Sequence, residues 1–159
     1  MTTFRRWCVG LALLCAPVAC AHRLIPGTQA VDTPQTREIY ALIVKVRDCL
    51  QRRDADGLMA MVSKAYFEDN GTPDPKDDYG YLELKGRLAQ DSLQAAQELW
   101  VSFQVFDIVV ERDYAHVDMR YSSRARLELP SGRLWDTTRD FDRLEFVREE
   151  GVWRIISGL

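Results

Sequence analysis

Residues 144–156 read Leu-Glu-Phe-Val-Arg-Glu-Glu-Gly-Val-Trp-Arg-Ile-Ile, and this stretch decides the fold. Two alternating apolar runs flank the dipeptide Glu150-Gly151, which is typical of a tight turn between antiparallel strands. Because successive side chains of a strand point to opposite faces, Trp153 shares one face of this hairpin with Phe146 and Ile155. We therefore expect a closing β-hairpin that buries Trp153 in the core.

Three segments predict the other strands, and the last of them runs into this hairpin. Residues 99–110 are rich in β-branched and aromatic side chains, and residues 114–129 alternate apolar with polar side chains. A turn at residues 130–132 leads into a third strand over 133–148. Because the connections are short, we expect neighbouring strands to pair in antiparallel order. The sequence thus predicts a curved antiparallel sheet of four or more strands.

A turn centred on residue 131 fixes a testable register for the central hairpin. It pairs Arg126 with Asp136 and Arg120 with Asp142 on the outer face, and Leu127 with Trp135 and Tyr121 with Phe141 on the inner face. Opposite charges and aromatic pairs at facing positions stabilise a sheet. The same register sets polar side chains against apolar ones further along, so we expect a β-bulge within residues 141–144 that restores the alternation.

The residues before the sheet predict three helices. Apolar side chains recur at helical spacing from Ile39 to Leu50, so a first helix begins near Thr36. Asp54 or Asp56 caps a second helix that runs to about residue 66. Residues 70–78 carry two prolines and form a loop, and residues 79–93 form a third helix. Helices followed by an antiparallel sheet indicate the α+β class.

This element order, the closing Gly151-Val152-Trp153-Arg154-Ile155-Ile156 and the segment 54–62 are similar to the NTF2-like (SnoaL-like, cystatin-like α+β cone) superfamily. The resemblance covers residues 36–159. It implies three N-terminal helices packed on a curved antiparallel sheet that wraps around a pocket. Some members use this pocket for proton abstraction or dehydration, with an Asp or an Asp and His pair plus Tyr donors, and others only bind ligands. The resemblance alone does not define a function.

The N-terminus indicates export. Arg5 and Arg6 precede an apolar run over residues 7–16, and residues 1–19 resemble a secretory signal peptide. Val18-Ala19-Cys20 is similar to a bacterial lipobox, which predicts that Cys20 receives a lipid. We therefore expect a lipid-anchored protein in the bacterial periplasm or at the outer membrane. The alternative is cleavage at Ala19-Cys20-Ala21, which releases a soluble secreted protein. Residues 20–35 are expected to be a flexible tether.

Candidate site residues follow from the predicted faces of the helices and strands. The aromatic residues that could line a pocket are Tyr40, Tyr66, Tyr81, Tyr121 and Trp135. His116 and Asp118 lie two residues apart on one strand face, but the alternation places that face outward. Asp136 or Asp140 becomes the candidate base of an acid and base enzyme if the bulge precedes Asp140 and turns its side chain inward.

Composition restricts the partners. The net charge is -3, and nucleic acid is not an expected partner. Two histidines give no metal-ligand cluster, no cofactor motif is present, and Cys49 is expected to be a buried apolar residue. We favour a non-enzymatic module that binds an apolar ligand or a protein partner, with a small isomerase or dehydratase as the alternative. A homodimer through the sheet is a further expectation.

We predict that Cys20 is lipidated and becomes the first residue of the mature protein. Radiolabelled palmitate should label the wild type and not the Cys20→Ser variant, because the thiol is the acceptor of the lipid. Cys49→Ser is the matched control and should keep the label. Equal labelling of the wild type and Cys20→Ser would contradict the prediction.

Overall fold

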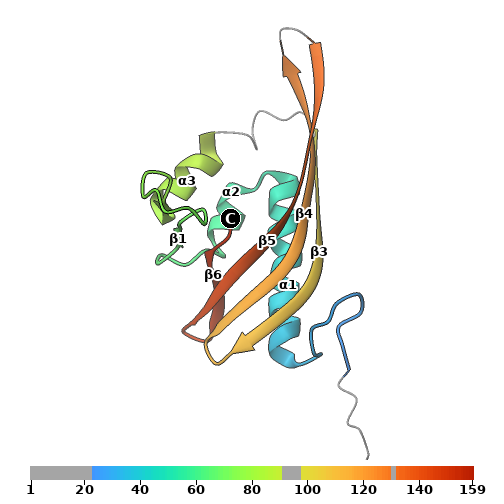
Figure 1. Cartoon of the computed structure of the whole chain (residues 1–159), viewed down its shortest axis with the longest axis vertical. Helices are drawn as coiled ribbons and strands as arrows, with labels where there is room; N and C mark the ends of the chain where they lie inside the picture. Colours follow the sequence, from blue (N-terminus) through green and yellow to red (C-terminus); the bar gives the residue numbers. More distant parts are fainter. Residues whose placement is uncertain (1–22, 91–97, 130–131) are drawn as a thin grey trace, which may run out of the picture.

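The computed structural model describes residues 23–90, 98–129 and 132–159. Four antiparallel strands form the main sheet in the order β3–β4–β5–β6. Its strands are β3 (Glu98–Glu111), β4 (Tyr114–Leu129), β5 (Gly132–Glu149) and β6 (Val152–Ser157) (Figure 1). The helices are α1 (Pro34–Arg52), α2 (Ala55–Met59) and α3 (Tyr81–Gln90), and the short strands β1 (Phe67–Glu68) and β2 (Tyr79–Gly80) pair with each other. The α+β class and the antiparallel sheet are confirmed.

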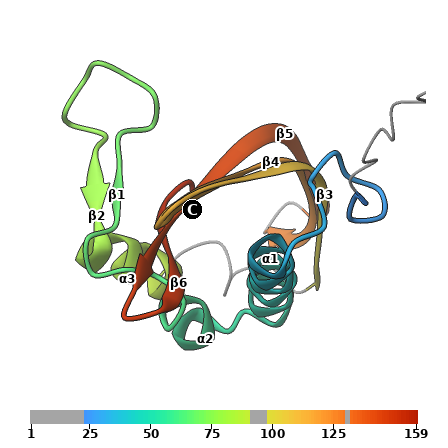
Figure 2. The ribbon, with the colours of Figure 1, turned by 90° about the horizontal axis from the view of Figure 1, so that it is seen from below.

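The sheet curves around α1, which lies on its concave side (Figure 2). Of the three helices, only α1 and α3 have seven or more residues. Side chains from α1, α2 and the concave face of the sheet make up the core, which includes Ile39, Val46, Leu58, Val117, Leu144, Phe146 and Ile155. The far ends of β4 and β5 extend beyond the helices as an arm (Figure 1).

Helix α1 begins at a complete capping box. The Thr33 hydroxyl accepts from the Thr36 N–H at 3.2 Å, and the Thr33 N–H donates to the Thr36 hydroxyl at 3.0 Å. Pro34 occupies the first turn, where its missing N–H costs nothing. The predicted apolar stripe is buried, and it includes Cys49, whose thiol pKa is raised by burial. The cap therefore starts the helix two residues before the predicted position.

Helix α2 is shorter than expected. The Asp54 carboxylate accepts from the Gly57 N–H at 2.8 Å, which confirms the predicted cap, but the helix ends at Met59 and not near residue 66. The backbone of the next residues pairs with β6 instead. The Ile155 N–H donates to the Met61 carbonyl at 3.0 Å, and the Ser63 N–H donates to the Ile155 carbonyl at 2.8 Å. Hydrogen bonds to a strand thus replace those that would continue the helix.

Residues 23–33 form a packed loop, so the expectation of a flexible tether over 20–35 is wrong for this part. Leu24 and Val31 make an antiparallel bridge, and Ile25 and Ala30 are buried. The Gln29 N–H donates to the carbonyl of Phe106 in β3 at 2.7 Å. Burying two apolar side chains ties the loop to the fold. The predicted signal peptide and Cys20 lie outside the described residues.

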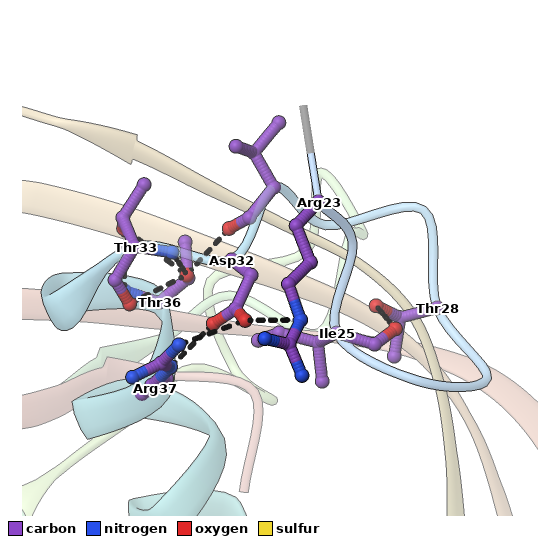
Figure 3. A network of polar contacts seen from close by, with 8 residues as sticks. Arg23, Ile25, Thr28, Asp32, Thr33, Thr36 and Arg37 are labelled. Carbon is purple, nitrogen blue, oxygen red and sulfur yellow. Dashed lines mark hydrogen bonds and ion pairs between the residues drawn. The ribbon is translucent and has the colours of Figure 1, made fainter. Parts of the chain in front are cut away.

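Asp32 closes this loop onto the start of α1 (Figure 3). Its carboxylate accepts from Arg37 through two donors of the guanidinium, and the Arg23 Nε atom lies 3.5 Å away. The hydrogen bond from Arg37 holds the pKa of Asp32 below its ordinary value. The Thr36 hydroxyl also donates to the Val31 carbonyl at 2.6 Å (Figure 3). These contacts join the packed loop to the helix cap.

The register of the central hairpin differs by one residue from the prediction. Tyr121 pairs with Asp140, and Met119 pairs with Asp142, without the bulge expected within residues 141–144. This uninterrupted register sets Val117 opposite Leu144, so apolar side chains meet across the core without an extra residue. The irregularities lie in the outer pairings instead, between Val105 and Asp107 and between Glu145 and Phe146.

The closing hairpin has the predicted register. Arg148 pairs with Trp153, and both turn residues have positive φ, with 49° at Glu150 and 83° at Gly151. This is the conformation of a two-residue turn that matches the strand twist. Trp153 is 5% exposed, and Ile155, on the same face, is fully buried. The burial of Trp153 is confirmed.

Replacing Trp153 with Ala should lower the free energy of unfolding by about 3–5 kcal/mol, because a large buried ring is removed from the core. Thermal and urea unfolding followed by circular dichroism measure the loss. Val152→Ala is the matched control, because Val152 lies next to Trp153 and is 55% exposed. A Trp153→Ala variant as stable as Val152→Ala would contradict the structural role.

Candidate functional site

A cavity of about 220 Å³ lies between the concave face of the sheet and the helices. Its walls are mostly apolar, and one carboxylate side chain, that of Asp142, is among them. The other lining residues are Leu50, Leu58, Leu88, Phe103, Met119, Tyr121, Leu144, Gly158 and Leu159. They come from α1, α2, α3, β3, β4, β5 and the segment after β6, so the cavity exists only in the folded chain. A mostly apolar pocket with few polar groups is typical of a small-molecule site.

Asp142 reaches the cavity because of its position in β5. It lies two residues before Leu144 and four before Phe146, which are both buried, so all three side chains share the concave face. Solvent reaches Asp142 through the open side of the cavity, but the surrounding apolar groups displace part of its water. This burial raises the pKa of Asp142 above its ordinary value, and the nearby negative charges of Glu68 and Asp140 add to the rise.

Within the described residues, the Asp142 carboxylate has one hydrogen-bond partner. Its Oδ1 atom accepts from the backbone N–H of Arg143 at 2.8 Å. The Arg143 guanidinium turns to the other face of the sheet, where its Nη2 atom donates to Asp118 at 3.0 Å. Asp142 therefore faces the cavity without a cationic side chain to neutralise it.

Glu68 holds the edge of the cavity in place. Its Oε2 atom accepts from the Gly158 N–H at 2.6 Å and lies 3.3 Å from the Ser157 hydroxyl. Gly158 itself needs glycine, because its φ is +91° and a Cβ atom would lie 2.1 Å from the Arg143 carbonyl oxygen. This close approach brings the end of β6 against β5, next to Asp142. The short strand β1 thus supports one wall of the cavity.

Two tyrosines bind the backbone at the same edge. The Tyr66 hydroxyl donates to the Leu159 carbonyl at 3.0 Å, and the Tyr79 hydroxyl donates to it at 2.6 Å. Burial raises the pKa of both hydroxyls above the ordinary value, so they remain protonated donors at neutral pH. Leu159 also packs against the core and lines the cavity. The tyrosines therefore position the cavity wall and do not face a ligand.

The structure separates the five aromatic residues expected to line the pocket. Tyr121 lines the cavity, and its ring lies 5.9 Å from that of Phe103. Tyr40 packs against the core, and Tyr66 contacts Leu159, as described above. Tyr81 instead lines a separate, open hollow of about 770 Å³, where Lys64 lies 3.7 Å above its ring. That larger hollow is bordered by charged and apolar side chains in similar measure.

Trp135 does not face the pocket, which corrects the prediction. The register shift of one residue pairs it with Arg126 and turns it to the outer face, where its ring stacks on Trp100 at 5.9 Å. His116 and Asp118 lie on that same outer face, as expected. Arg143 binds Asp118 and lowers the pKa of this carboxyl. Neither His116 nor Asp118 lines the cavity.

The two aspartates proposed as bases also lie away from the cavity walls. Asp140 and Asp142 are both exposed on the concave side of β5, but Asp140 does not line the cavity, and its carboxylate accepts from the Phe141 N–H at 2.8 Å. Asp136 is exposed near the far end of β5. Asp142 takes the position expected of them, and sequence reasoning missed it because the assumed register placed it outward. The signal that could have identified Asp142 is the buried pair Leu144 and Phe146, because every second residue before them lies on the same face of the strand.

The geometry allows hydrogen bonding or proton transfer by one carboxylate inside an apolar cavity. Within the described ranges, no group of three or more His, Cys, Asp and Glu side chains is placed to hold a metal ion. Asp142 accepts a hydrogen bond or a proton when it is ionised, and it donates a hydrogen bond when it is neutral. The sequence places no carboxylate clearly inward, and for this reason it favours a non-enzymatic module. Asp142 does line the cavity, so the structure removes this argument against the enzyme.

Known structures share this architecture at low sequence identity. A candidate dehydratase of the NTF2-like family from Streptomyces avermitilis is 15% identical, with a TM-score of 0.64 over 79% of this chain and 95% of that chain. A ketosteroid isomerase-like protein from Erwinia carotovora atroseptica is 13% identical, with a TM-score of 0.60 over 80% and 95%. An NTF2-like protein with a cystatin-like fold from Novosphingobium aromaticivorans is 16% identical, with a TM-score of 0.56 over 77% and 78%.

No family model matches the sequence, and no curated protein matches it. The likeness to the structures from Streptomyces avermitilis and Erwinia carotovora atroseptica covers 79% and 80% of this chain. The chain therefore has the NTF2-like, cystatin-like α+β fold.

Proposed function

We propose that this protein binds a small, largely apolar molecule in the cavity between the sheet and the helices, with Asp142 as the one ionisable contact. The observation that carries the proposal is the combination of apolar walls with a single inward carboxylate. Apolar contacts supply most of the affinity in such a site, and the polar group orients the ligand.

The size of the cavity limits the ligand. A dry apolar cavity of about 150 Å³ accommodates a benzene-sized molecule. The 220 Å³ of this cavity is therefore suited to one ring with a short substituent. A ligand that carries a hydroxyl or a carbonyl group can reach Asp142, because this residue and Leu144 are neighbours on the same face of β5.

The proposal includes export and a lipid anchor at Cys20. Its support is the basic start, the short apolar run and Val18-Ala19-Cys20 in the sequence. The packed loop over residues 23–33 would then follow the anchor almost directly. The binding domain would stand close to the membrane, with only a few residues between the lipid and the fold.

A second candidate function is proton transfer by Asp142, of the kind used by an isomerase or a dehydratase. The observation that favours it is the raised pKa of this carboxyl, which burial brings closer to the range useful for a general base. The similar structures from Erwinia carotovora atroseptica and Streptomyces avermitilis are described as isomerase-like and as a candidate dehydratase. Binding is common to both candidates, and only the second requires chemistry.

Binding to the cavity can be tested with p-cresol as the probe. Leu88→Trp should weaken p-cresol binding at least tenfold, because the larger ring fills the cavity that Leu88 lines. Titrations followed by NMR measure the dissociation constant and check the fold of each variant. Leu82→Trp is the matched control, since Leu82 lies on the same helix and is 82% exposed. Equal binding by the two folded variants would contradict the proposal.

Proton transfer by Asp142 can be tested with cyclohexanone in heavy water. The wild type should accelerate exchange of the hydrogens next to the carbonyl, and Asp142→Asn should lose a factor of about 100 or more. The wild-type rate should rise with pH as Asp142 loses its proton. Because the pKa of Asp142 is raised, the rise should lie at higher pH than for an exposed aspartate.

Asparagine still accepts the hydrogen bond from the Arg143 N–H, so Asp142→Asn preserves the edge of the cavity. Asp136→Asn removes the same charge from the exposed part of β5 and should exchange like the wild type. If Asp142→Asn exchanges as fast as the wild type, the enzyme candidate is wrong and the binding proposal remains, because p-cresol binding is measured separately.

A further inference from the structure

Six side chains form a strip on the outer face of the main sheet, away from α1 and from the cavity. We call this set the aromatic–arginine strip, and it consists of Trp100, Phe106, Arg120, Arg124, Trp135 and Phe141. The alternation of each strand fixes the face, because the neighbours Val101, Val105, Met119 and Leu144 are buried on the other side. Nothing in the proposed function uses this strip.

The strip has two similar units, and each holds an arginine of β4 between aromatic rings of β3 and β5. In the first unit, Trp100 and Trp135 stack at 5.9 Å, and the Arg124 guanidinium lies 4.2 Å from the Trp135 ring. In the second, Phe106 and Phe141 stack at 5.8 Å. The Arg120 guanidinium lies 4.8 Å from the Phe141 ring. The two arginines are four positions apart on β4, which is about 13 Å along the strand.

The irregular pairing of β3 with β4 completes the second unit. Val105 pairs with Met119, and Asp107 pairs with Asp118, so Phe106 is the extra residue between them. This bulge allows Val105 and Ile108 to be buried on the inner face while Phe106 stacks with Phe141 on the outer face. A β-bulge re-aims a side chain in this way.

Large aromatic side chains in the strip are exposed. Trp100 is 53% exposed, Trp135 is 40% exposed and Phe141 is 69% exposed. Soluble proteins seldom leave several adjacent aromatic rings in water, and such a patch marks an interaction surface. Trp and Phe combined with Arg are also the side chains that enter the interface of a bilayer, where the rings meet the acyl boundary and the guanidinium meets phosphate.

The strip carries positive charge that the carboxylates of the described residues do not pair with. On the same part of the outer face, three ion pairs join Arg126 to Glu98, Arg133 to Glu128 and Arg143 to Asp118. Arg120, Arg124 and Arg139 have no carboxylate partner among the described residues. The protein as a whole has a net charge of -3, so this local excess of arginine distinguishes the strip from the rest of the surface.

The shape of the face favours a soft partner. The sheet is concave toward α1, so the strip lies on the convex side (Figure 2). A stable protein interface needs close shape complementarity, and a convex face restricts the area over which a rigid partner can reach it. A second copy of this chain would bring another set of unpaired arginines against the first. A lipid headgroup layer deforms around a convex surface and supplies the missing negative charge.

We propose that the aromatic–arginine strip docks on the anionic headgroups of a lipid bilayer. Arg120 and Arg124 contact the lipid phosphates, and the rings of Trp100, Trp135 and Phe141 enter the interface beside them. Among the described residues no helix is long and apolar enough to cross a membrane, and the docking is peripheral. This inference stands on the outer face alone and does not depend on the cavity or on lipidation of Cys20.

The test is co-sedimentation of the full chain, carrying Cys20→Ser to exclude an attached lipid, with vesicles. Vesicles of phosphatidylglycerol mixed with phosphatidylcholine should bind it, and phosphatidylcholine vesicles should bind it much less. Arg120→Gln with Arg124→Gln should weaken binding to the anionic vesicles about 20- to 30-fold, since two charges leave the surface. Added salt should weaken the wild type for the same reason.

Two further variants test whether vesicle binding depends on the strip or only on the net charge and hydrophobicity of the protein. Lys45→Gln with Lys85→Gln removes the same charge at exposed positions of α1 and α3 and should leave binding unchanged. Trp100→Ser with Phe141→Ser keeps every arginine and should weaken binding at least tenfold. Because none of the substituted side chains is buried, circular dichroism should show wild-type folding for all variants.

Several outcomes would overturn the proposal. One is equal vesicle binding by the strip variants and the lysine control, since the first 22 residues, which all variants share, would then account for the binding. Another is equal binding to vesicles with and without phosphatidylglycerol. A third is sedimentation of the wild type as a dimer that the strip variants abolish, without a difference in vesicle binding, because the strip would then join two copies of the chain.

Discussion

The structure depends on β6, whose backbone around Ile155 has hydrogen-bonded neighbours along both edges of the strand. On one side β6 pairs with β5, and on the other its N–H and carbonyl groups bind Met61 and Ser63. This constraint ends α2, joins the helical part to the sheet and buries Ile155 and Trp153 between them. It also carries the chain onward to Gly158, so the cavity beside Asp142 exists because β6 is held where it is.

The two-residue period of the central strands separates two surfaces of opposite character. On the concave face, Leu144 and Asp142 of β5 meet the helices and enclose a small apolar cavity with one carboxylate. On the convex face, the aromatic–arginine strip is exposed to solvent. A shift of one residue in register would exchange these faces, because each side chain would move to the other side of the sheet. The proposed ligand site and the proposed membrane surface therefore rest on the same alignment of β4 with β5.

The polar contacts that position the site lie behind its walls. Glu68 accepts from Gly158, and Tyr66 and Tyr79 donate to Leu159, so the segment after β6 is held against β5. Such hydrogen bonds hold a wall in place while leaving apolar atoms to face a ligand. The raised pKa of Asp142 follows from the same packing, since the apolar neighbours displace part of the water around its carboxylate.

Local sequence determined the elements whose signals lie within a few residues: the α1 stripe, the Asp54 cap, the strand segments and the Glu150-Gly151 hairpin, with Trp153 on its buried face. Only the tertiary structure decided the end of α2, the packing of residues 23–33 and the register that turns Trp135 outward and Asp142 inward. The physical reason is that these features depend on partners distant in the chain. A strand can slip by one residue without changing its own alternation, and the buried contact between Val117 and Leu144 selects the register.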